Sequence, residues 1–345
     1  MTPWLSILIP AFQVADYLHE CLASIMPQLD SGCEVLLLDD ASPDHGYAIM
    51  HSWQQAYPNQ IKIYRHEHNQ GLSAARNTLL HHANGRYLWF FDSDDVMNTG
   101  AISELESIIK VQAPDLVLCD FELLRNKRSL KHYLRGEHHR SSFHGPKQQL
   151  CSDKEVLITG LFAAGQMHIW SKISKRSLWQ QGLLFPVGRY FEDIHVSPKL
   201  ALNAASYYYQ PSTWVQYRQR PGSILSNKAP AMQRKKAIDL AEALLGFESS
   251  LQQVLPHRQA RTNFYISYFC SRNFIGACKA TTASQEAPNQ QLQQNLAALK
   301  ASISMPLPDL LLGYFRQGWL VRALKLSYWL HKAQGSARNT AWLHW

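Results

Sequence analysis

Two groups of acidic residues in the first third of the chain have the chemistry of a cation site. Asp39-Asp40 closes an apolar run at residues 34–39, and Asp92-Ser93-Asp94-Asp95 follows another at residues 87–91. Ligands of open parallel sheets bind beyond the carboxyl ends of strands, so we expect both groups at one edge. Carboxylate oxygens suit Mg²⁺ or Mn²⁺, which also bind phosphate oxygens. A solvated acidic turn is the alternative interpretation.

An arginine adds a second charged group to this region. Arg76 lies one turn before Leu80 in a helix predicted over residues 72–83, on the stripe that faces the sheet. A buried guanidinium requires an anionic partner, because an unpaired buried charge is costly. Asp40, Asp92 and a nucleotide are the candidates. A structural ion pair, or extension of the side chain to the protein edge, is the competing interpretation.

Alternating strands and helices are expected to position these residues. Apolar runs separated by amphipathic stretches predict a mostly parallel sheet covered by helices on both faces, in an α/β domain. The predicted strands cover residues 5–9, 34–39, 61–64, 87–91, 115–119, 207–209 and 214–217. The predicted helices in this part cover residues 14–28, 72–83 and 101–111.

Short polar segments predict helix ends. Ser42-Pro43 has the residue types of a helix cap followed by a first-turn proline, and Asn84-Gly85 those of a helix stop. Ser152-Asp153-Lys154-Glu155 fits a capping box that opens another helix.

Length and composition indicate a folded chain in two parts. The 345 residues are 46% hydrophobic, which excludes disorder for most of the chain. Residues 125–149 are polar and predict a surface excursion. Beyond residue 228 the pattern is helical to the end. We therefore expect an α/β domain over residues 1–228 and a helical region over residues 229–345.

Charge and cysteine content limit the function classes. Net charge is +8 and the pI is about 9.1, which fits a nucleotide, a nucleic acid or an anionic membrane surface as partner. The six cysteines include no Cys-x-x-Cys pair, so free thiols in a reducing cytoplasm are expected. Neither a secretory signal nor an apolar stretch of about 18 residues is evident. The expected location is cytoplasmic, with or without contact at the inner face of the cytoplasmic membrane.

Four segments in order resemble one protein family. They are Ser6-Ile7-Leu8-Ile9-Pro10-Ala11-Phe12, Leu38-Asp39-Asp40-Ala41-Ser42-Pro43-Asp44, Asn69-Gln70-Gly71-Leu72-Ser73-Ala74-Ala75-Arg76-Asn77 and Asp92-Ser93-Asp94-Asp95. Together they resemble the family 2 glycosyltransferases of GT-A fold, inverting enzymes that use nucleotide-sugar donors. The resemblance covers residues 4–225, including Phe191-Glu192-Asp193 and the segment 217–224.

The resemblance implies a nucleotide pocket at the first strand ends. Pro10, Ala11 and Phe12 would line this pocket. Asp40 would accept a hydrogen bond from the base, expected to be uracil, and Arg76 would lie against the base and ribose.

The resemblance also implies a metal and a general base. Asp92 would contact the ribose or metal-bound water, and Asp94 would bind Mn²⁺ or Mg²⁺ directly. Asp193 would be the general base, with Glu192 as the neighbouring alternative.

The remaining implied contacts are with sugar and diphosphate. Asp95 and Lys172 would reach the transferred or acceptor sugar, although a structural role for Lys172 is an equal alternative. Arg218 and Arg220 would assist at the diphosphate, and a loop containing Ser223 would close over the donor.

The implied reaction transfers a hexosyl or N-acetylhexosaminyl group, with inversion, from a nucleotide sugar to a hydroxyl group. The acceptor would be a glycan or a lipid-linked molecule in bacterial surface polysaccharide assembly. A nucleic-acid-binding or glycan-binding protein without activity is the main alternative, but the acidic strand ends oppose a polyanion. A nucleotidyltransferase is expected to have a Gly-rich loop where Pro10-Ala11-Phe12 stands.

The end of the chain predicts an amphipathic helix over residues 310–332. Leu320, Leu324 and Tyr328 share one face, and the basic Arg322, Lys325 and Lys332 share another. Tryptophans 319, 329, 342 and 345 add interfacial aromatic residues. Docking on an anionic leaflet is one interpretation. Packing against the catalytic domain, or against a second subunit in a homodimer, is the other.

Overall fold

The computed structural model describes residues 2–125, 130–220, 229–284 and 289–335 of two units, Met1–Pro221 and Gly222–Trp345. The predicted domain boundary near residue 228 falls within residues 221–228, outside the described part.

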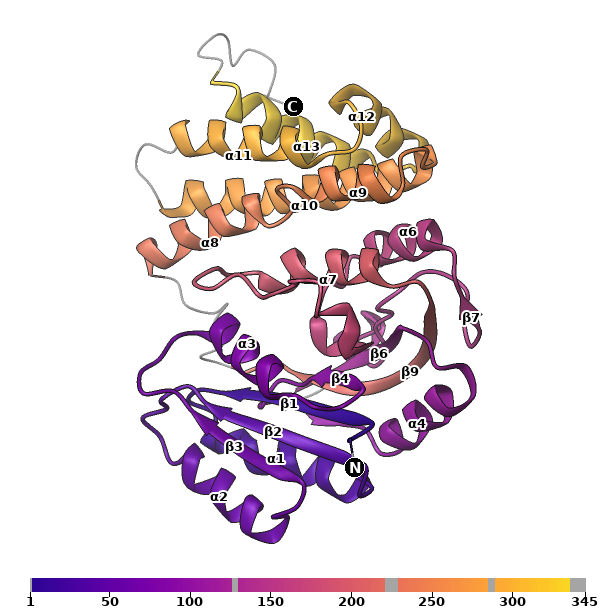
Figure 1. Ribbon diagram of the computed structural model, residues 1–345. Coiled ribbons are helices and arrows are strands. Elements are labelled where there is room, and N and C mark those ends of the chain that lie inside the picture. The colour runs from indigo at the N-terminus through magenta and orange to yellow at the C-terminus, as the bar shows by residue number, and fades with distance from the viewer. Residues whose placement is uncertain (1, 126–129, 221–228, 285–288, 336–345) are drawn as a thin grey trace. The chain divides into compact units, whose positions relative to one another are not determined.

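A nine-stranded sheet organises the described part of the first unit (Figure 1). Its order is β3-β2-β1-β4-β8-β6-β9-β5, with β7 beside β9. β1 pairs in parallel with β2 and β4, β2 with β3, and β6 with β9, whereas β8 runs antiparallel between β4 and β6. The strands are β1 (Leu5–Ala11), β2 (Cys33–Asp39), β3 (Ile61–Arg65), β4 (Tyr87–Phe90), β5 (Val96–Met97), β6 (Leu116–Leu124), β7 (Leu150–Cys151), β8 (Lys172–Lys175) and β9 (Tyr207–Arg218). The predicted mostly parallel α/β architecture is confirmed.

Helices cover both faces of this sheet, which explains the uninterrupted apolar strands. Ile7 and Ile9 of β1 join a core cluster with Leu18 and Leu22 of α1, while α3 packs on β1 and β2. The helices are α1 (Ala15–Ile25), α2 (Gly46–Ala56), α3 (Leu72–His82), α4 (Ala101–Gln112), α5 (Leu130–Leu134), α6 (Lys154–Ala164) and α7 (Glu192–Asn203). Short 3₁₀ turns occupy Met26–Gln28, Ile169–Ser171 and Arg176–Leu178.

Two of the predicted helix caps are wrong. Helix α2 begins at Gly46 rather than at Pro43. The Ser42 hydroxyl does not cap a helix, because it accepts a hydrogen bond from the backbone N–H of Gln13 at 3.1 Å. Helix α6 begins as predicted, but its cap is Asp153, whose carboxylate accepts from Val156 N at 3.0 Å.

The surface excursion predicted over residues 125–149 is partly buried. The Phe143 side chain is 1% exposed and contacts the rings of Tyr207 and Tyr209. Asp120, which is fully buried, accepts hydrogen bonds from Ser142 N and from the Tyr209 hydroxyl and lies 2.7 Å from His139 Nε2. This segment therefore returns to the sheet instead of leaving it.

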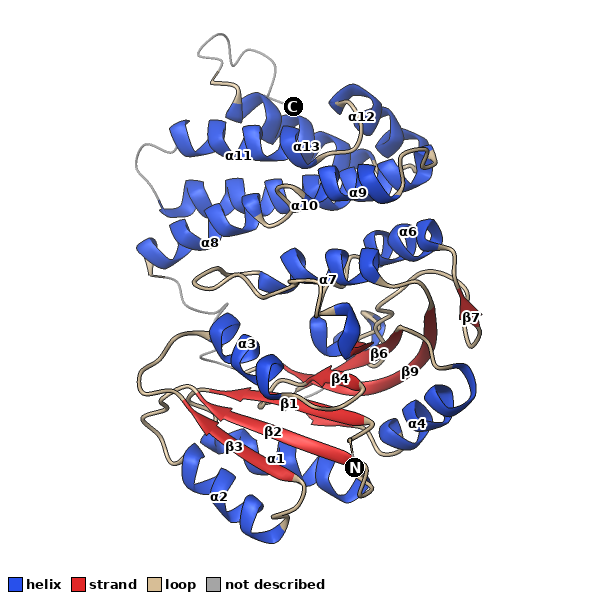
Figure 2. Ribbon diagram, in the orientation of Figure 1, coloured by secondary structure: helices blue, strands red, loops and turns tan. Residues whose placement is uncertain are grey.

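The described part of the second unit is helical (Figure 2). Its helices are α8 (Pro230–Glu242), α9 (Phe247–Val254), α10 (Ala260–Ser284), α11 (Asn289–Ser302), α12 (Leu307–Arg316) and α13 (Leu320–Ala333). α8, α11, α12 and α13 all pack against α10. The single helix predicted over residues 310–332 is wrong, because the chain breaks at Gly318, where φ is +69°.

Among the described residues, no single helix is long and apolar enough to cross a membrane. One pair, Asn289–Ser302 with Leu307–Arg316, reaches the required length and composition only together and is bent by 78°.

Candidate active site

The carboxyl ends of β1, β2 and β4 bring the sequence-predicted residues to one edge of the sheet. β1 lies between the other two, with Ala11 paired to Asp39 and Leu8 paired to Phe90. The loops that follow contain strained backbone. Gln13 and Ala41, neither of them glycine, have φ of 53° and 56°. Such conformations are costly for residues with a side chain and cluster at functional sites.

Arg76 of α3 is the centre of this edge. Its side chain is 1% exposed, and its two terminal nitrogens contact three carboxylates. Nη2 lies 2.9 Å from Asp92, and Nη1 lies 2.7 Å from Glu192 and 3.0 Å from Asp193. Of the predicted partners, Asp92 is confirmed. The ion pairs with Glu192 and Asp193 were not foreseen, because nothing local links residues 116 and 117 positions apart.

The Glu-Asp pair opens helix α7, where the helix dipole favours acidic side chains. Phe191, the residue before the helix, has φ of 60°, a third non-glycine residue in the left-handed region near this edge. Asp193 also accepts a hydrogen bond from Ile169 N at 3.2 Å. Both oxygens of Asp193 therefore have fixed partners, while its side chain stays 17% exposed.

Burial raises the pKa values of two carboxyl groups around Arg76, those of Glu192 and Asp92. Burial raises the pKa of Glu192 to about 7, with a further contribution from the charge of Asp193. Burial also raises the pKa of Asp92 against the opposing effect of Arg76. The Arg76 pKa is raised by its three carboxylates, which outweigh its own burial, so it stays charged. One cation thus holds a cluster in which Glu192 is partly protonated near neutral pH.

The other acids of the Asp92–Asp95 segment contact the end of β9. Asp94 Oδ2 lies 2.5 Å from Arg220 Nε, and its carbonyl accepts from Arg218 Nε at 2.6 Å. Asp95 is fully buried and accepts from Arg218 N at 2.8 Å through one oxygen, while the other has no hydrogen-bond partner among the residues that the structure describes. Burial therefore raises the Asp95 pKa well above its ordinary range. In the structure the two arginines contact acids of the site, and their predicted role at a diphosphate stays a prediction.

Asp40, predicted to contact the base, organises the neighbouring loop. Its carboxylate accepts hydrogen bonds from Gln70 N at 2.9 Å and Gly71 N at 2.8 Å and lies 2.7 Å from His66 Nδ1. Gly71, which precedes α3, has φ of +86°, a conformation that favours glycine. Asp40 thereby fixes the start of the helix that carries Arg76.

The other predicted residues differ in accessibility. Pro10 and Ala11 are buried in β1, whereas Phe12 is 39% exposed beyond its end. Lys172 is 1% exposed and donates to the carbonyls of Gln166 and His168 at 2.9 and 2.7 Å, so its amino group holds the loop before β8. Ser223 lies outside the described residues.

His168 is a residue of this region that the sequence analysis missed. Its ring stacks on Trp170 at 4.7 Å and 9° and contacts the rings of Phe121 and Tyr217. Burial lowers the His168 pKa to about 4 despite the nearby charge of Asp193. No strand alternation marks this residue in the sequence, because the residues that follow it form the 3₁₀ turn Ile169–Ser171.

The acids suit a metal only in combination with a ligand. Among the described residues, no group of three or more His, Cys, Asp or Glu side chains is arranged to hold an ion. Asp92 and Asp94 supply hard oxygen donors, and Mg²⁺ is usually bound through one or two carboxylates together with substrate phosphates. This donor set fits a divalent ion shared with a diphosphate.

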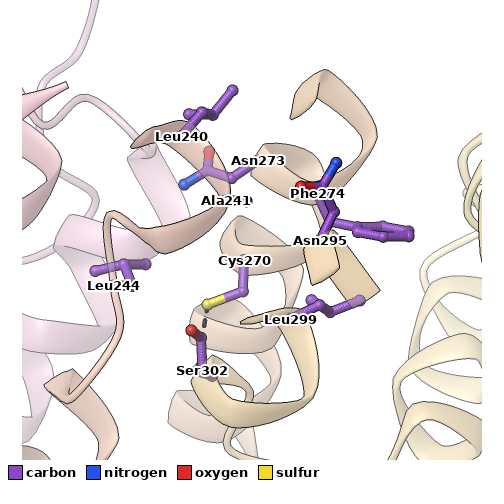
Figure 3. Close-up of a pocket in the computed structure, with 9 residues that line it drawn as sticks. All are labelled: Leu240, Ala241, Leu244, Cys270, Asn273, Phe274, Asn295, Leu299 and Ser302. Carbon is purple, nitrogen blue, oxygen red and sulfur yellow. Dashed lines mark hydrogen bonds between the residues drawn. The ribbon is translucent and has the colours of Figure 1, made fainter. Parts of the chain in front are cut away.

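A small cavity in the helical unit contains none of the predicted site residues (Figure 3). Apolar side chains from α8, α10 and α11 surround Cys270, Asn273 and Asn295, and the Cys270 thiol contacts the Ser302 carbonyl at 3.4 Å. We assign it no ligand.

Fold and site together define an α/β domain of GT-A architecture. The structure superposes on S. aureus TarS residues 1–349 in complex with UDP, with a TM-score of 0.64 and 18% identity, over 96% of this chain and 92% of that one. It also superposes on the mannosyltransferase PcManGT from Pyrobaculum calidifontis in complex with GDP-Man and Mn²⁺, with a TM-score of 0.51 and 16% identity, over 98% and 89% of the two chains.

Residues 6–170 match the family model "Glycosyl transferase family 2", so this segment has the sequence of a family 2 glycosyltransferase domain. The glycosyltransferase GlyA of Streptococcus pneumoniae is 27% identical over 225 residues, which are 64% of this chain. The match spans 31% of the length of GlyA.

Proposed function

We propose that the chain transfers a hexosyl or N-acetylhexosaminyl group from a nucleotide sugar, with UDP as the expected nucleotide, to a hydroxyl group. The acceptor is a glycan or a lipid-linked molecule of bacterial surface polysaccharide assembly. The observation that carries the proposal is Arg76, whose guanidinium joins Asp92 after β4 to the Glu-Asp pair of α7. The relative GlyA is named a glycosyltransferase, which supports sugar transfer. TarS was solved in complex with UDP, which supports UDP as the nucleotide.

Asp193 is the proposed general base. An acceptor hydroxyl is a weak nucleophile until a carboxylate takes its proton during attack on the anomeric carbon. Arg76 and Ile169 N orient the Asp193 carboxylate, which remains partly exposed for an acceptor. Glu192 is the weaker candidate, because its pKa near 7 leaves it partly protonated at neutral pH.

Single displacement on the side opposite the leaving nucleotide inverts the anomeric centre. The proposed arrangement needs one base and no covalent nucleophile, so an α-linked donor gives a β-glycoside. Asp94, with Asp92, would hold Mn²⁺ or Mg²⁺ together with diphosphate oxygens. When bound, such an ion stabilises the charge that develops on the leaving diphosphate. Arg220, which now contacts Asp94, would be released toward that diphosphate.

The test is a panel of UDP- and GDP-sugars incubated with the full-length protein and Mn²⁺, with and without a chelator. We expect release of the nucleoside diphosphate from at least one UDP-sugar and loss of release with chelator. Asp193→Asn should lower turnover about a hundredfold or more, the usual contribution of a general base, with unchanged donor affinity.

Asp309→Asn, at an exposed acid of the helical unit, is the matched control and should retain activity. No release from any donor, or full activity of Asp193→Asn, would refute the assignment. Activity that does not depend on the chelator would refute only the proposed role of the metal ion and would leave the other assignments standing.

A further inference from the structure

Helix α13 is apolar on two sides. Its inner side buries Ala323, Leu326 and Leu330 within the helical unit. Its outer side exposes an apolar set that we name the α13 face: Leu320 (55%), Val321 (64%), Leu324 (66%) and Tyr328 (47%). Leu320, Leu324 and Tyr328 are four residues apart and lie in one row along the helix. A surface helix of a globular protein normally has a polar outer side, so the α13 face is an unusual exposed apolar surface of the helical unit.

The neighbouring helix extends the apolar exposure. α12 packs against α13 and exposes Leu312 (46%) and Phe315 (51%). Single exposed apolar residues are ordinary, but several on two adjoining helices are typical of an interaction surface.

The charged residues of α13 are all basic, whereas α12 carries one acid, Asp309, besides Arg316. Arg316 and Lys325 are exposed, and the Lys332 amino group lies 5.9 Å from the centre of the Tyr328 ring. In the sequence no acidic residue follows Asp309. The surface therefore combines apolar side chains and an aromatic ring with cations, and α13 itself has no acid that would compensate them.

We propose that the α13 face docks on an anionic lipid membrane, with phosphatidylglycerol-type headgroups as the charged partners. Apolar side chains would enter the headgroup boundary while Lys325 and Arg316 meet lipid phosphates. A second copy of the chain fits less well, because a symmetric contact would bring like charges together with no acid on α13 to pair with them. The proposal goes beyond the transfer reaction and does not rest on it.

The test is flotation of the full-length protein with vesicles of phosphatidylcholine alone and of equal phosphatidylcholine and phosphatidylglycerol. We expect binding to the anionic vesicles. The double variant Leu320→Ser/Leu324→Ser should bind at least about tenfold more weakly, and Lys325→Gln about fivefold, since a basic residue near an anionic surface contributes about a factor of this size.

The matched control is Val111→Ser/Leu150→Ser, which removes two exposed apolar side chains from the first unit and should bind like the wild type. All four substituted apolar positions are solvent-exposed, and far-ultraviolet circular dichroism verifies folding. Light scattering after size exclusion measures the oligomeric state.

Three outcomes would overturn the proposal. They are no binding to anionic vesicles, equal binding by the α13 variant and the wild type, and a wild-type dimer that the α13 variant converts to monomer without any vesicle binding. Donor hydrolysis is measured on the same samples, so a failure of docking remains separate from a failure of the proposed activity.

Discussion

Among single residues, Arg76 has the largest expected effect, because three carboxylates depend on it. Arg76→Met should lower the free energy of unfolding by about 4 kcal/mol at pH 7.5, the usual cost of leaving buried charges without their partner. Arg76→Lys should cost less, because the charge remains although one ammonium cannot reproduce the forked geometry. Urea denaturation of both variants measures this.

The loss caused by Arg76→Met should shrink as the pH falls below 7. Glu192, with its raised pKa, then becomes neutral and no longer requires a cation. A loss of less than about 1 kcal/mol at pH 7.5 would contradict the proposed role of Arg76 in holding the acids together.

His168 predicts a pH dependence of stability. Its pKa falls from 6.5 to about 4 on burial, so between these values the unfolded chain binds the proton more readily than the folded chain. The contribution of the neutral ring to the stability of the folded protein is thus fully present above pH 6.5 and is lost as the pH falls from 6.5 to about 4. His168→Phe keeps the stacked ring and removes the titration.

Relative to His168→Phe, the wild type should therefore lose about 2 kcal/mol between pH 8 and pH 5. Urea denaturation at several pH values checks the difference. Parallel curves for the two proteins would show that His168 is protonated as easily in the folded state as in the unfolded state.

At the scale of elements, the helix end predicted at Asn84-Gly85 is found, but Gly85 is required there for a reason other than helix termination. Asn84-Gly85 follows α3 as predicted, but Gly85 is not in the left-handed region. Its amide donates to Ser6 Oγ at 2.7 Å, and an added Cβ would lie 2.5 Å from Ser6 N. The glycine is thus required by the close approach of the chain to β1.

Gly85→Ala should destabilise the protein by about 3 kcal/mol, because the backbone of β1 cannot give way easily. Gly276→Ala, in the interior of α10, is the contrasting variant. The added Cβ would meet the flexible end of the Leu240 side chain at 3.0 Å. This substitution should therefore change the free energy of unfolding by less than about 1 kcal/mol. Thermal unfolding of both proteins measures the contrast, and equal losses would contradict it.

The sequence missed β5, β7 and β8 and divided β9 into two strands, but it predicted β1, β2 and β4 because each is a buried apolar run, whose pattern depends only on neighbouring residues. It therefore also predicted which edge holds Asp40, Arg76 and Asp92. The partners of the site residues depend on contacts distant in the chain. Two of these contacts, between Arg220 and Asp94 and between Glu192 and Arg76, bridge more than 100 positions. Helix starts failed where a polar side chain such as Ser42 is used elsewhere in the fold.

At the scale of the whole molecule, the net charge of +8 gives docking on a membrane a dependence on salt. Screening shortens the reach of a charge from about 10 Å at 0.1 M salt to about 3 Å at 1 M, whereas apolar contacts are not weakened by salt. Binding to anionic vesicles should therefore fall severalfold between 0.1 and 0.5 M NaCl and then level off.

Substitution separates the two contributions on the α13 face. Lys325→Gln/Arg316→Gln should bind more weakly at 0.1 M and change less with salt, because the attraction that salt screens has been removed. Leu320→Ser/Leu324→Ser should retain a steep salt dependence but bind weakly throughout, because only the cations remain. Flotation over a series of NaCl concentrations measures both slopes. The same salt dependence in the two variants would mean that these cations do not face the lipid, and that charge elsewhere on the protein attracts it to the membrane.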